Sequence, residues 1–400
     1  MSKHFAFVTL PAHGHVNPTL PLVRELLRRG HRVSYATGPE LLPAVRETGA
    51  TPVELPWILD TDTLARAIAD PDYMAENLSV MMDSFLDITK DCLPLLIEHF
   101  QHDRPDMVCC EKRTVGAALA DKLDVPEATL VPHFASNEYF DMWELLMPAF
   151  DPEAPELREF RANVAAFAAE HGLAAERLMT SSTNTGVNLV FIPREFQIVN
   201  ETFDDTFHFI GPSVDSRVSS GDWQPPGDGA PVLFISLGTV FNDRPEFFTL
   251  CAKAFGDSAW HVAMAVGEKV DPATLGDIPA NFEVRPYFPQ TTVLRHATAF
   301  LSHAGMNSTM DSLYHAVPLI AVPQQPEQVA NADRVEELGL GRCLDASTLT
   351  ADLLRNTVDE VANSPETRAN LVRFSQTIRT SRGATAGADI LEARLAGAPT

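Results

Sequence analysis

The sequence is short of basic residues. Among its 400 residues, 30 Lys and Arg stand against 54 Asp and Glu, which gives a formal net charge of −24. A field of this sign repels the phosphate backbone of nucleic acids and the surface of anionic membranes, so neither is expected as a partner. An anionic small molecule can still bind where backbone N–H groups converge on it.

Long apolar runs and paired cysteines are also missing. No run approaches the roughly 18 to 20 apolar residues of a membrane span, and the apolar run before Pro11 is too short for the core of a signal peptide. The five cysteines are an odd number without CxxC spacing, which argues against a disulfide framework and a structural zinc site. We therefore expect a reduced, cytoplasmic protein. The GxGxxG and GxxxxGK[ST] patterns are absent too, which disfavours a dehydrogenase and a P-loop enzyme.

The arrangement of apolar residues predicts an α/β protein of about two domains. A strand over 4–10 precedes a helix that Asn17 caps and Gly30 ends, and a strand over 31–37 completes a βαβ unit. A helix over 115–123 continues the alternation, which restarts at 232 after a Ser-, Gly- and Pro-rich segment. We expect two doubly wound domains with a ligand cleft between them: an N-terminal domain over 1–213, a linker over 214–230, a C-terminal domain over 231–378, and a final segment over 379–400.

Two histidines, His13 and His15, lie in the loop expected after the first strand. A neutral imidazole at the carboxyl end of a strand can take a proton from a bound hydroxyl near pH 7. Such a base needs a carboxylate to orient it, and Glu111, just past the expected strand 106–110, is the candidate. A solvated histidine and an exposed Glu at a helix start are the plainer interpretations. The residues alone do not choose between His13 and His15.

The C-terminal half carries a candidate anion site. SLGT ends a strand with Gly238 and Thr239, and HAGMNS leads into a helix whose free N–H groups and dipole favour a diphosphate. Asp311 follows one turn later, where its carboxylate can accept hydrogen bonds from a ribose. The plainer interpretation is a helix that is simply capped by Asn307 or Ser308. The residues of HAGMNS that carry the hypothesis are His303, Gly305, Asn307 and Ser308.

Two further segments fit a sugar and an apolar ligand. Glu327 and Gln328 follow a strand at an expected helix start, where a carboxylate and an amide suit sugar hydroxyls, although a solvated helix start has the same pattern. The segment 133–150 combines aromatic, Met and amide side chains, which suits a large apolar ligand and equally suits ordinary core packing. Asn137 and Trp143 are its candidate contacts.

Together these motifs resemble the UDP-glycosyltransferase superfamily (glycosyltransferase family 1), and in particular its bacterial macrolide and antibiotic glycosyltransferases. The resemblance covers nearly the whole chain, including PAHGHVNPTLPLVRELLRRGHRVSYAT at 11–37 and the block from YFPQTT to ELGLG at 287–341. It implies a GT-B fold, in which two Rossmann-like domains face a central cleft. The first domain then binds the acceptor, the second binds the nucleotide sugar, and the last helix packs back on the first domain.

The resemblance also assigns roles to residues. The base is the second histidine of the pair, His15, and Glu111 stands where many relatives carry an Asp. Tyr287 replaces the Trp that plant relatives stack on uracil, and Met306 replaces the Trp of their HCGWNS motif, where a backbone contact tolerates the change. No metal or cofactor is implied besides the UDP-sugar co-substrate. The implied donor-binding residues are Gly238, Thr239, Tyr287, Gln290, His303, Gly305, Met306, Asn307, Ser308, Asp311, Glu327 and Gln328.

We therefore expect an inverting hexosyltransferase of the EC 2.4.1 type. It would move glucose from UDP-glucose to a hydroxyl of a hydrophobic natural product, foremost a macrolide antibiotic, in resistance or in biosynthesis. A nucleotide-sugar epimerase shares the architecture but needs acid and base groups flanking C2 of the sugar. A catalytically silent helper or binding protein of the same fold is the other alternative. The sequence does not indicate an oligomeric state.

Overall fold

The computed structural model describes residues 1–60, 63, 66, 71–112, 114–146, 154–179, 186–214, 221–239 and 242–397. The chain forms two compact units. Unit 1 comprises residues 1–213 and 381–400, and unit 2 comprises residues 214–380. Part of the segment expected as a linker, 215–220, lies outside the described residues.

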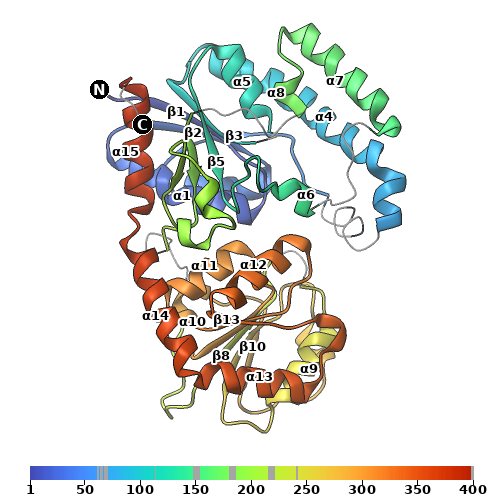
Figure 1. The fold of residues 1–400 in the computed structure, drawn as a ribbon, viewed down its shortest axis with the longest axis vertical. Coiled ribbons are helices and arrows are strands. Elements are labelled where there is room, and N and C mark those ends of the chain that lie inside the picture. Colours follow the sequence, from blue (N-terminus) through green and yellow to red (C-terminus); the bar gives the residue numbers. More distant parts are fainter. Residues whose placement is uncertain are drawn as a thin grey trace. The chain divides into compact units, whose positions relative to one another are not determined.

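Unit 1 is built on one parallel sheet (Figure 1). Its strand order is β3-β2-β1-β4-β5-β6-β7, so the direction of strand addition reverses between β1 and β4. In open parallel sheets, ligands bind beyond the carboxyl ends of the strands at such a reversal. The strands are β1 (His4–Val8), β2 (Arg32–Thr37), β3 (Thr51–Glu54), β4 (Met107–Glu111), β5 (Glu127–Val131), β6 (Asn188–Val190) and β7 (Phe207–Phe209).

Helices cover both faces of this sheet because its strands are apolar on both sides. In β1, Phe5 and Phe7 enter the core under α1 and α15, whereas Ala6 and Val8 enter the core under α4 and α5. The described helices of unit 1 include α1 (His13–Arg28), α2 (Leu42–Arg46), α4 (Pro71–Gln101), α5 (Val115–Leu123), α6 (Met142–Leu146), α7 (Arg158–His171), α8 (Glu176–Met179) and α15 (Gly383–Leu395).

Unit 2 repeats this plan with a six-stranded parallel sheet in the order β10-β9-β8-β11-β12-β13. Its reversal lies between β8 and β11, and α9 and α13 cover one face through Leu233 and Ile235. The strands are β8 (Val232–Ser236), β9 (His261–Ala265), β10 (Phe282–Arg285), β11 (Ala299–Ser302), β12 (Leu319–Ala321) and β13 (Gly341–Cys343). The helices are α9 (Pro245–Phe255), α10 (Gln290–Leu294), α11 (Met306–Tyr314), α12 (Pro326–Glu337), α13 (Ala351–Asn363) and α14 (Pro365–Thr380).

The last helix, α15, belongs to unit 1 and lies along α1 (Figure 1). Arg29, just past the end of α1, donates from Nη1 to Asp389 and Glu392, each at 2.7 Å. Arg29 Nε also donates to Glu25 at 2.8 Å. Leu391 is fully buried in the same core as the apolar face of α1, so apolar packing and a charge network together hold α15.

The chain crosses between the units twice, and the two crossings are neighbours within unit 1. The Gly383 amide donates to the Ile210 carbonyl at 3.0 Å, and the Ala384 amide donates to Ser213 Oγ at 2.8 Å. Gly211 has φ +75°, and a Cβ there would lie 2.3 Å from Ser381 Oγ. Only glycine fits this close approach.

Helix α1 begins earlier than the sequence predicts. Its N-cap is Ala12, whose carbonyl accepts from the His15 amide at 2.9 Å and from the Val16 amide at 3.0 Å. The expectation that Asn17 caps this helix is therefore wrong, since Asn17 and Pro18 both lie inside it. The chain turns directly after Pro11, so His15 is a residue of the first helical turn and not of a loop.

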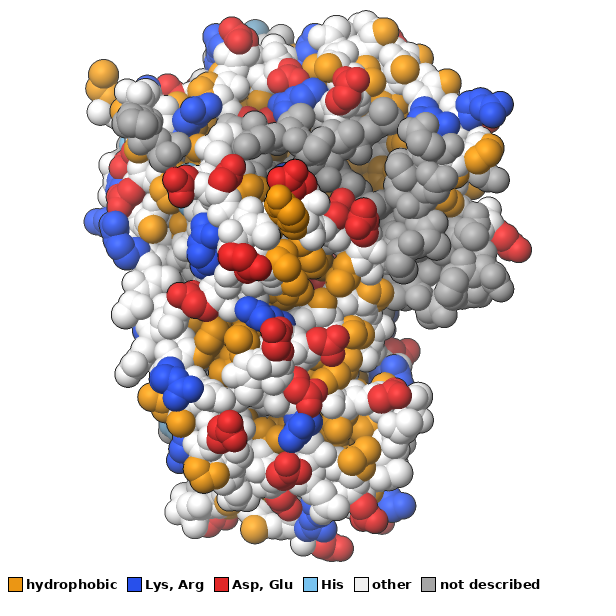
Figure 2. Space-filling model, viewed as in Figure 1, with side chains coloured by type: hydrophobic (Ala, Val, Ile, Leu, Met, Phe, Trp, Pro, Cys, Tyr) orange, Lys and Arg blue, Asp and Glu red, His pale blue; other side chains and the backbone are white. Residues whose placement is uncertain are grey.

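On the face shown in Figure 2, acidic side chains are scattered among basic ones and do not gather into one patch. This distribution agrees with a net charge of −24 that arises over the whole chain. None of the described helices is long and apolar enough to cross a membrane.

Candidate active site

Each unit places predicted residues at the reversal point of its own sheet. In unit 1, His15 follows β1 and Glu111 ends β4, and these two strands are neighbours. In unit 2, Gly238 follows β8 and His303 follows β11, which are also neighbours. We call the first group the dyad site, and the second, where the sequence predicts that a nucleotide binds, the nucleotide site.

The dyad site brings His15 and Glu111 into direct contact. His15 Nδ1 lies 2.5 Å from Glu111 Oε2. The Glu111 side chain is 4% exposed and the His15 side chain 27% exposed, so the pair is shielded from water on the carboxylate side. Because a carboxylate accepts, His15 donates from Nδ1, and in the neutral ring Nε2 then carries no proton. This is the arrangement of a base held by a carboxylate.

Glu111 is held by the backbone as well. Its other oxygen, Oε1, accepts from the Leu10 amide at 3.1 Å. Glu111 is the last residue of β4, paired with Leu130, and not a residue just past the strand as the sequence predicts. The Glu111 side chain, which is one methylene longer than the Asp of many relatives, therefore starts from a fixed backbone and reaches His15 from the end of β4.

The other histidine of the motif, His13, is exposed on the same turn of α1. The structure records a side-chain bond to Glu111 for His15 and none for His13 among the described contacts. A third imidazole, His133, lies near the dyad: its ring centroid is 6.2 Å from that of His15, at an interplanar angle of 75°. His133 begins the segment 133–150, but no local pattern in the sequence distinguishes it from its neighbours.

In the nucleotide site, His303 lies between two glycines. A Cβ on Gly238 would lie 2.7 Å from His303 Nε2, and a Cβ on Gly305 would lie 2.5 Å from the same atom. Gly238 also has φ +82°, a backbone conformation that costs other residues about 1–2 kcal/mol. Burial lowers the pKa of His303 to about 4, although a backbone hydrogen bond with Ser236 opposes the shift. The ring is therefore neutral at pH 7.

Two buried amides hold the loops around His303. Asn242 donates from Nδ2 to the Gly238 carbonyl at 2.8 Å. Asn331, fully buried on α12, donates from Nδ2 to the Ala304 carbonyl at 2.9 Å. Ala304 has φ +61°, so the turn after β11 is strained and needs such support. Neither amide was predicted: Asn242 lies outside the motifs, and Asn331 lies within the block 287–341 but was assigned no role.

The N-terminus of α11 faces this loop without a side-chain cap. Its N-cap is Gly305, so the interpretation that Asn307 or Ser308 caps the helix is wrong. The side chain of Met306 is buried, and at this position the residue offers its backbone N–H. The first N–H groups of a helix, with the positive end of its dipole, form a site for an anion.

Gln290 links the remaining predicted residues of α11. Gln290 Nε2 donates to Asp311 Oδ2 at 2.8 Å, and its Oε1 accepts from Ser308 Oγ at 3.4 Å. Asp311 is 3% exposed. One oxygen of this buried carboxylate is thus bonded to a protein amide, and Gln290, on a neighbouring short helix, is fixed by two contacts.

The other predicted donor residues differ in exposure. Tyr287 is 62% exposed, and Thr239 is exposed beside Gly238. Glu327 is half-buried in the first turn of α12. Gln328 is buried and its Oε1 accepts from the Gln324 amide at 2.8 Å. One lone pair of Gln328 Oε1 is thus used by the backbone, and its Nε2 donors have no such partner among the described contacts.

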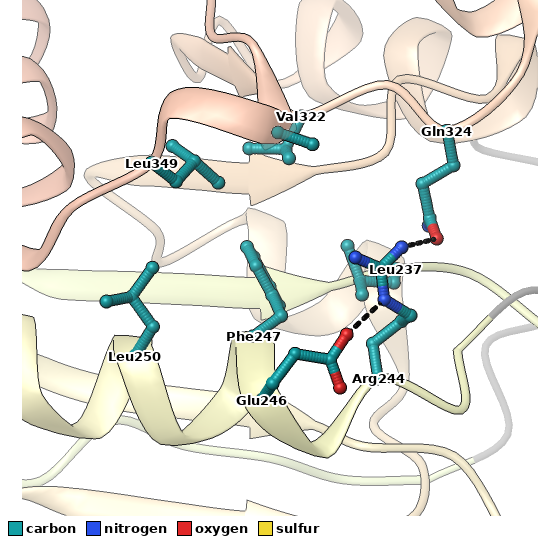
Figure 3. Close-up of a pocket in the computed structure, with 9 residues that line it drawn as sticks. Leu237, Arg244, Glu246, Phe247, Leu250, Val322, Gln324 and Leu349 are labelled. Atoms are coloured by element: carbon teal, nitrogen blue, oxygen red, sulfur yellow. Dashed lines mark hydrogen bonds and ion pairs between the residues drawn. The ribbon is translucent and has the colours of Figure 1, made fainter.

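Unit 2 also contains a pocket of about 200 Å³ at the ends of β8 and β12 (Figure 3). Arg244 lies at its rim, where it donates to Gln324 Oε1 at 3.3 Å and to Glu246 Oε1 at 2.5 Å. None of the predicted donor residues lines it. The lining residues are Leu237, Arg244, Glu246, Phe247, Leu250, Val322, Gln324, Ala346 and Leu349.

The segment after β5 does not bear out Asn137 as an acceptor contact. Asn137 donates from Nδ2 to the Thr202 carbonyl and to Thr202 Oγ1, and its Oδ1 accepts from the Tyr139 and Phe140 amides. These bonds occupy the amide in shaping its own loop. The side chain of Trp143 lies outside the described residues. Within the described part of the chain, no group of three or more His, Cys, Asp or Glu side chains is placed to hold a metal ion.

Comparisons with known proteins agree across the whole chain. Residues 221–382 match the family described as "UDP-glucoronosyl and UDP-glucosyl transferase". The chain is 37% identical to the NDP-glycosyltransferase YjiC of Bacillus subtilis, over 98% of this chain and 97% of that protein. It is 35% identical to the oleandomycin glycosyltransferase of Streptomyces antibioticus, over 98% and 91%. A crystal structure of a calicheamicin glycosyltransferase superposes with a TM-score of 0.85 at 33% identity, covering 99% of this chain and 98% of that one.

Proposed function

This chain belongs to the UDP-glucoronosyl and UDP-glucosyl transferase family and is a glycosyltransferase with a GT-B fold, and we propose that it transfers glucose from UDP-glucose, with inversion, to a hydroxyl of a hydrophobic natural product. The observation that carries this proposal is the contact of 2.5 Å between His15 Nδ1 and Glu111 Oε2. With Nδ1–H donated to Glu111, Nε2 of the neutral His15 ring carries no proton and can accept one, which is what the attack of a hydroxyl requires.

In the proposed reaction, the acceptor hydroxyl gives its proton to His15 Nε2 while its oxygen bonds to the anomeric carbon of the sugar. The bond between that carbon and the β-phosphate oxygen breaks, and UDP leaves from the opposite face, so the configuration inverts. Glu111 stabilises the imidazolium that forms, because it accepts the Nδ1–H and carries the opposite charge. The proton then returns to water when the products leave.

The nucleotide site supplies the groups that the donor needs. The diphosphate is proposed to bind the N–H groups of α11, with Gly238, Thr239 and the neutral His303 around it. Oriented N–H groups stabilise the charge that develops on the leaving diphosphate without reorganising, so no metal is required in the proposal. The remaining roles follow the family. Tyr287 is proposed to stack on the uracil ring, Gln290 and Asp311 to bind the ribose, and Glu327 and Gln328 to bind the transferred sugar.

The names of relatives support the acceptor class and leave the nucleotide open. The oleandomycin glycosyltransferase is named for a macrolide antibiotic, which supports a macrolide as the acceptor of this chain. The name of the Bacillus subtilis relative specifies only a nucleoside diphosphate. We propose UDP because the matched family is described by UDP sugars.

The test is mass spectrometry of products from UDP-glucose or dTDP-glucose and a macrolide such as oleandomycin. A hexose mass increment is expected with UDP-glucose. His15→Ala should bind UDP normally and transfer about 10²- to 10⁴-fold more slowly, the usual contribution of a general base. His13→Ala is the matched control, since His13 is exposed on the same turn, and it should keep wild-type turnover.

The same assay distinguishes the alternatives. Wild-type turnover by His15→Ala would refute His15 as the base. Epimerised nucleotide sugar in the absence of an acceptor would identify an epimerase. UDP binding without turnover on any acceptor or donor would point to a helper or binding protein of this fold.

A further inference from the structure

His133 lies at the same sheet edge as the dyad. The three strands β1, β4 and β5 are consecutive neighbours in the sheet, and they are followed or ended by His15, Glu111 and His133 respectively. The carboxyl ends of parallel strands meet at one edge, so the three side chains converge there. The centroid distance of 6.2 Å between His15 and His133 shows that they do.

The backbone that carries His133 is rigid. Phe134 is fully buried and stacks on Phe196 with ring centroids 5.6 Å apart. The next residue, Ala135, exchanges two hydrogen bonds with the buried side chain of Gln197, at 2.8 and 3.1 Å. A side chain on a backbone held in this way keeps its place relative to the dyad.

The two imidazoles are matched in their protonation. His133 Nδ1 lies 2.7 Å from the Phe134 carbonyl, and because a carbonyl only accepts, Nδ1 carries the proton. His15 donates from Nδ1 to Glu111 in the same way. In the neutral form of each ring Nε2 then carries no proton, and in the described part of the chain no protein group bonds to Nε2 of the half-buried His133.

We propose that His133 is a specificity-determining residue that accepts a hydrogen bond from a second hydroxyl of the acceptor, next to the one that reacts. The favoured acceptors are then vicinal diols, including catechols. Two hydroxyls on adjacent carbons can each approach one ring at the usual O–H···N distance of about 2.8 Å when the rings are this close. The reacting hydroxyl gives its proton to His15, whereas the second hydroxyl keeps its proton and only donates. This inference rests on the proposed role of His15.

The test compares two coumarins that share the same 7-hydroxyl. One is 7-hydroxy-4-methylcoumarin, and the other is 6,7-dihydroxy-4-methylcoumarin, which adds a neighbouring hydroxyl. For each enzyme, the preference is kcat/KM for the diol divided by kcat/KM for the single hydroxyl. Comparing this preference between variants cancels the intrinsic acidity of the two acceptors.

His133→Phe keeps a flat ring beside His15 but removes Nε2, and it should lower the preference by about 2- to 10-fold, the effect of one neutral hydrogen bond. His133→Gln restores an acceptor atom without the ring, and it should keep more of the preference than His133→Phe. Tyr139→Phe is the matched control, because Tyr139 is exposed on the same loop and its hydroxyl has no assigned role; its preference should equal that of the wild type.

A preference for the diol that is unchanged in His133→Phe would overturn the inference. A preference that His133→Phe and His133→Gln lower equally would also overturn it, because that result would indicate a structural role of the ring. Failure of the proposed function would give a different result in this assay. It would appear as wild-type turnover by His15→Ala with either coumarin, whatever the preference.

Discussion

The packing of His303 between two glycines leads to a prediction that separates steric crowding from backbone strain. Gly305 has φ −60° and ψ 144°, which alanine adopts freely. A Cβ there would nevertheless lie 2.5 Å from His303 Nε2 and 3.2 Å from Cε1. In Gly305→Ala the imidazole must therefore move, and its contribution to the nucleotide site is lost with it.

The size of the effect follows from the hydrogen bond at stake. A hydrogen bond to a charged group contributes about 1.5–3 kcal/mol, and each 1.4 kcal/mol is about a factor of ten in affinity. We expect Gly305→Ala and His303→Ala each to weaken the binding of UDP about 10- to 100-fold. The double variant should be no weaker than His303→Ala alone, within about 0.5 kcal/mol, because the added methyl then meets no ring.

Isothermal titration calorimetry at fixed pH and salt measures the affinity of the wild type, the two single variants and the double variant for UDP. Gly14→Ala is the control, since a Cβ at Gly14 meets nothing within 4 Å, and its affinity should be that of the wild type. Independent losses that add in the double variant would refute the reasoning, because they would mean that Gly305 acts on UDP by a route other than the imidazole.

Three other outcomes are expected. Glu111→Gln removes the negative charge beside His15 and should lower kcat by about 10²- to 10⁴-fold; full activity in a turnover assay would contradict the dyad. The pKa of His303 is about 4, so the affinity for UDP-glucose should not increase through this ring between pH 8 and pH 5.5, which calorimetry at both values checks. Hydrogen bonds from Arg28 and then Arg29 lower the pKa of Glu25 from 4.5 to about 2, so Glu25 stabilises the fold above its unfolded pKa and loses this effect as the pH falls. Glu25→Gln should lower the melting temperature at pH 7, and its difference from the wild type should shrink between pH 4.5 and pH 2 in thermal melts.

The sequence predicts the elements with strong apolar periodicity well. The helix expected over 115–123 is observed as α5 (Val115–Leu123), and both sheets are parallel and doubly wound as expected. The start of α1 was missed because it depends on backbone bonds from His15 and Val16 to the Ala12 carbonyl. No side-chain cap marks these bonds, so the polar HGH segment has the pattern of a loop.

The sequence predicts the partner of His15, since Glu111 ends a neighbouring strand and contacts His15, but it does not predict other features that depend on the distance between strands. The motifs bring His303, Gly238 and Gly305 to attention, but only the fold shows that a Cβ on either glycine would meet the same ring atom. His133 is one residue of an aromatic segment, and it becomes significant only because β5 lies beside β4 and β4 beside β1. Such proximity has no local pattern that a sequence can display.

The paired chain crossings make unit 2 an insertion within unit 1, and this has a consequence for recombination. A fragment that stops at residue 213 lacks α15 and therefore part of the core of unit 1. The uninterrupted segment 214–380 can instead be exchanged as one cassette, with both junctions side by side at Ser213 and Ser381. A chimera with a relative's nucleotide site then needs two splices, and a single crossover within the gene leaves α15 from one parent packed on α1 from the other.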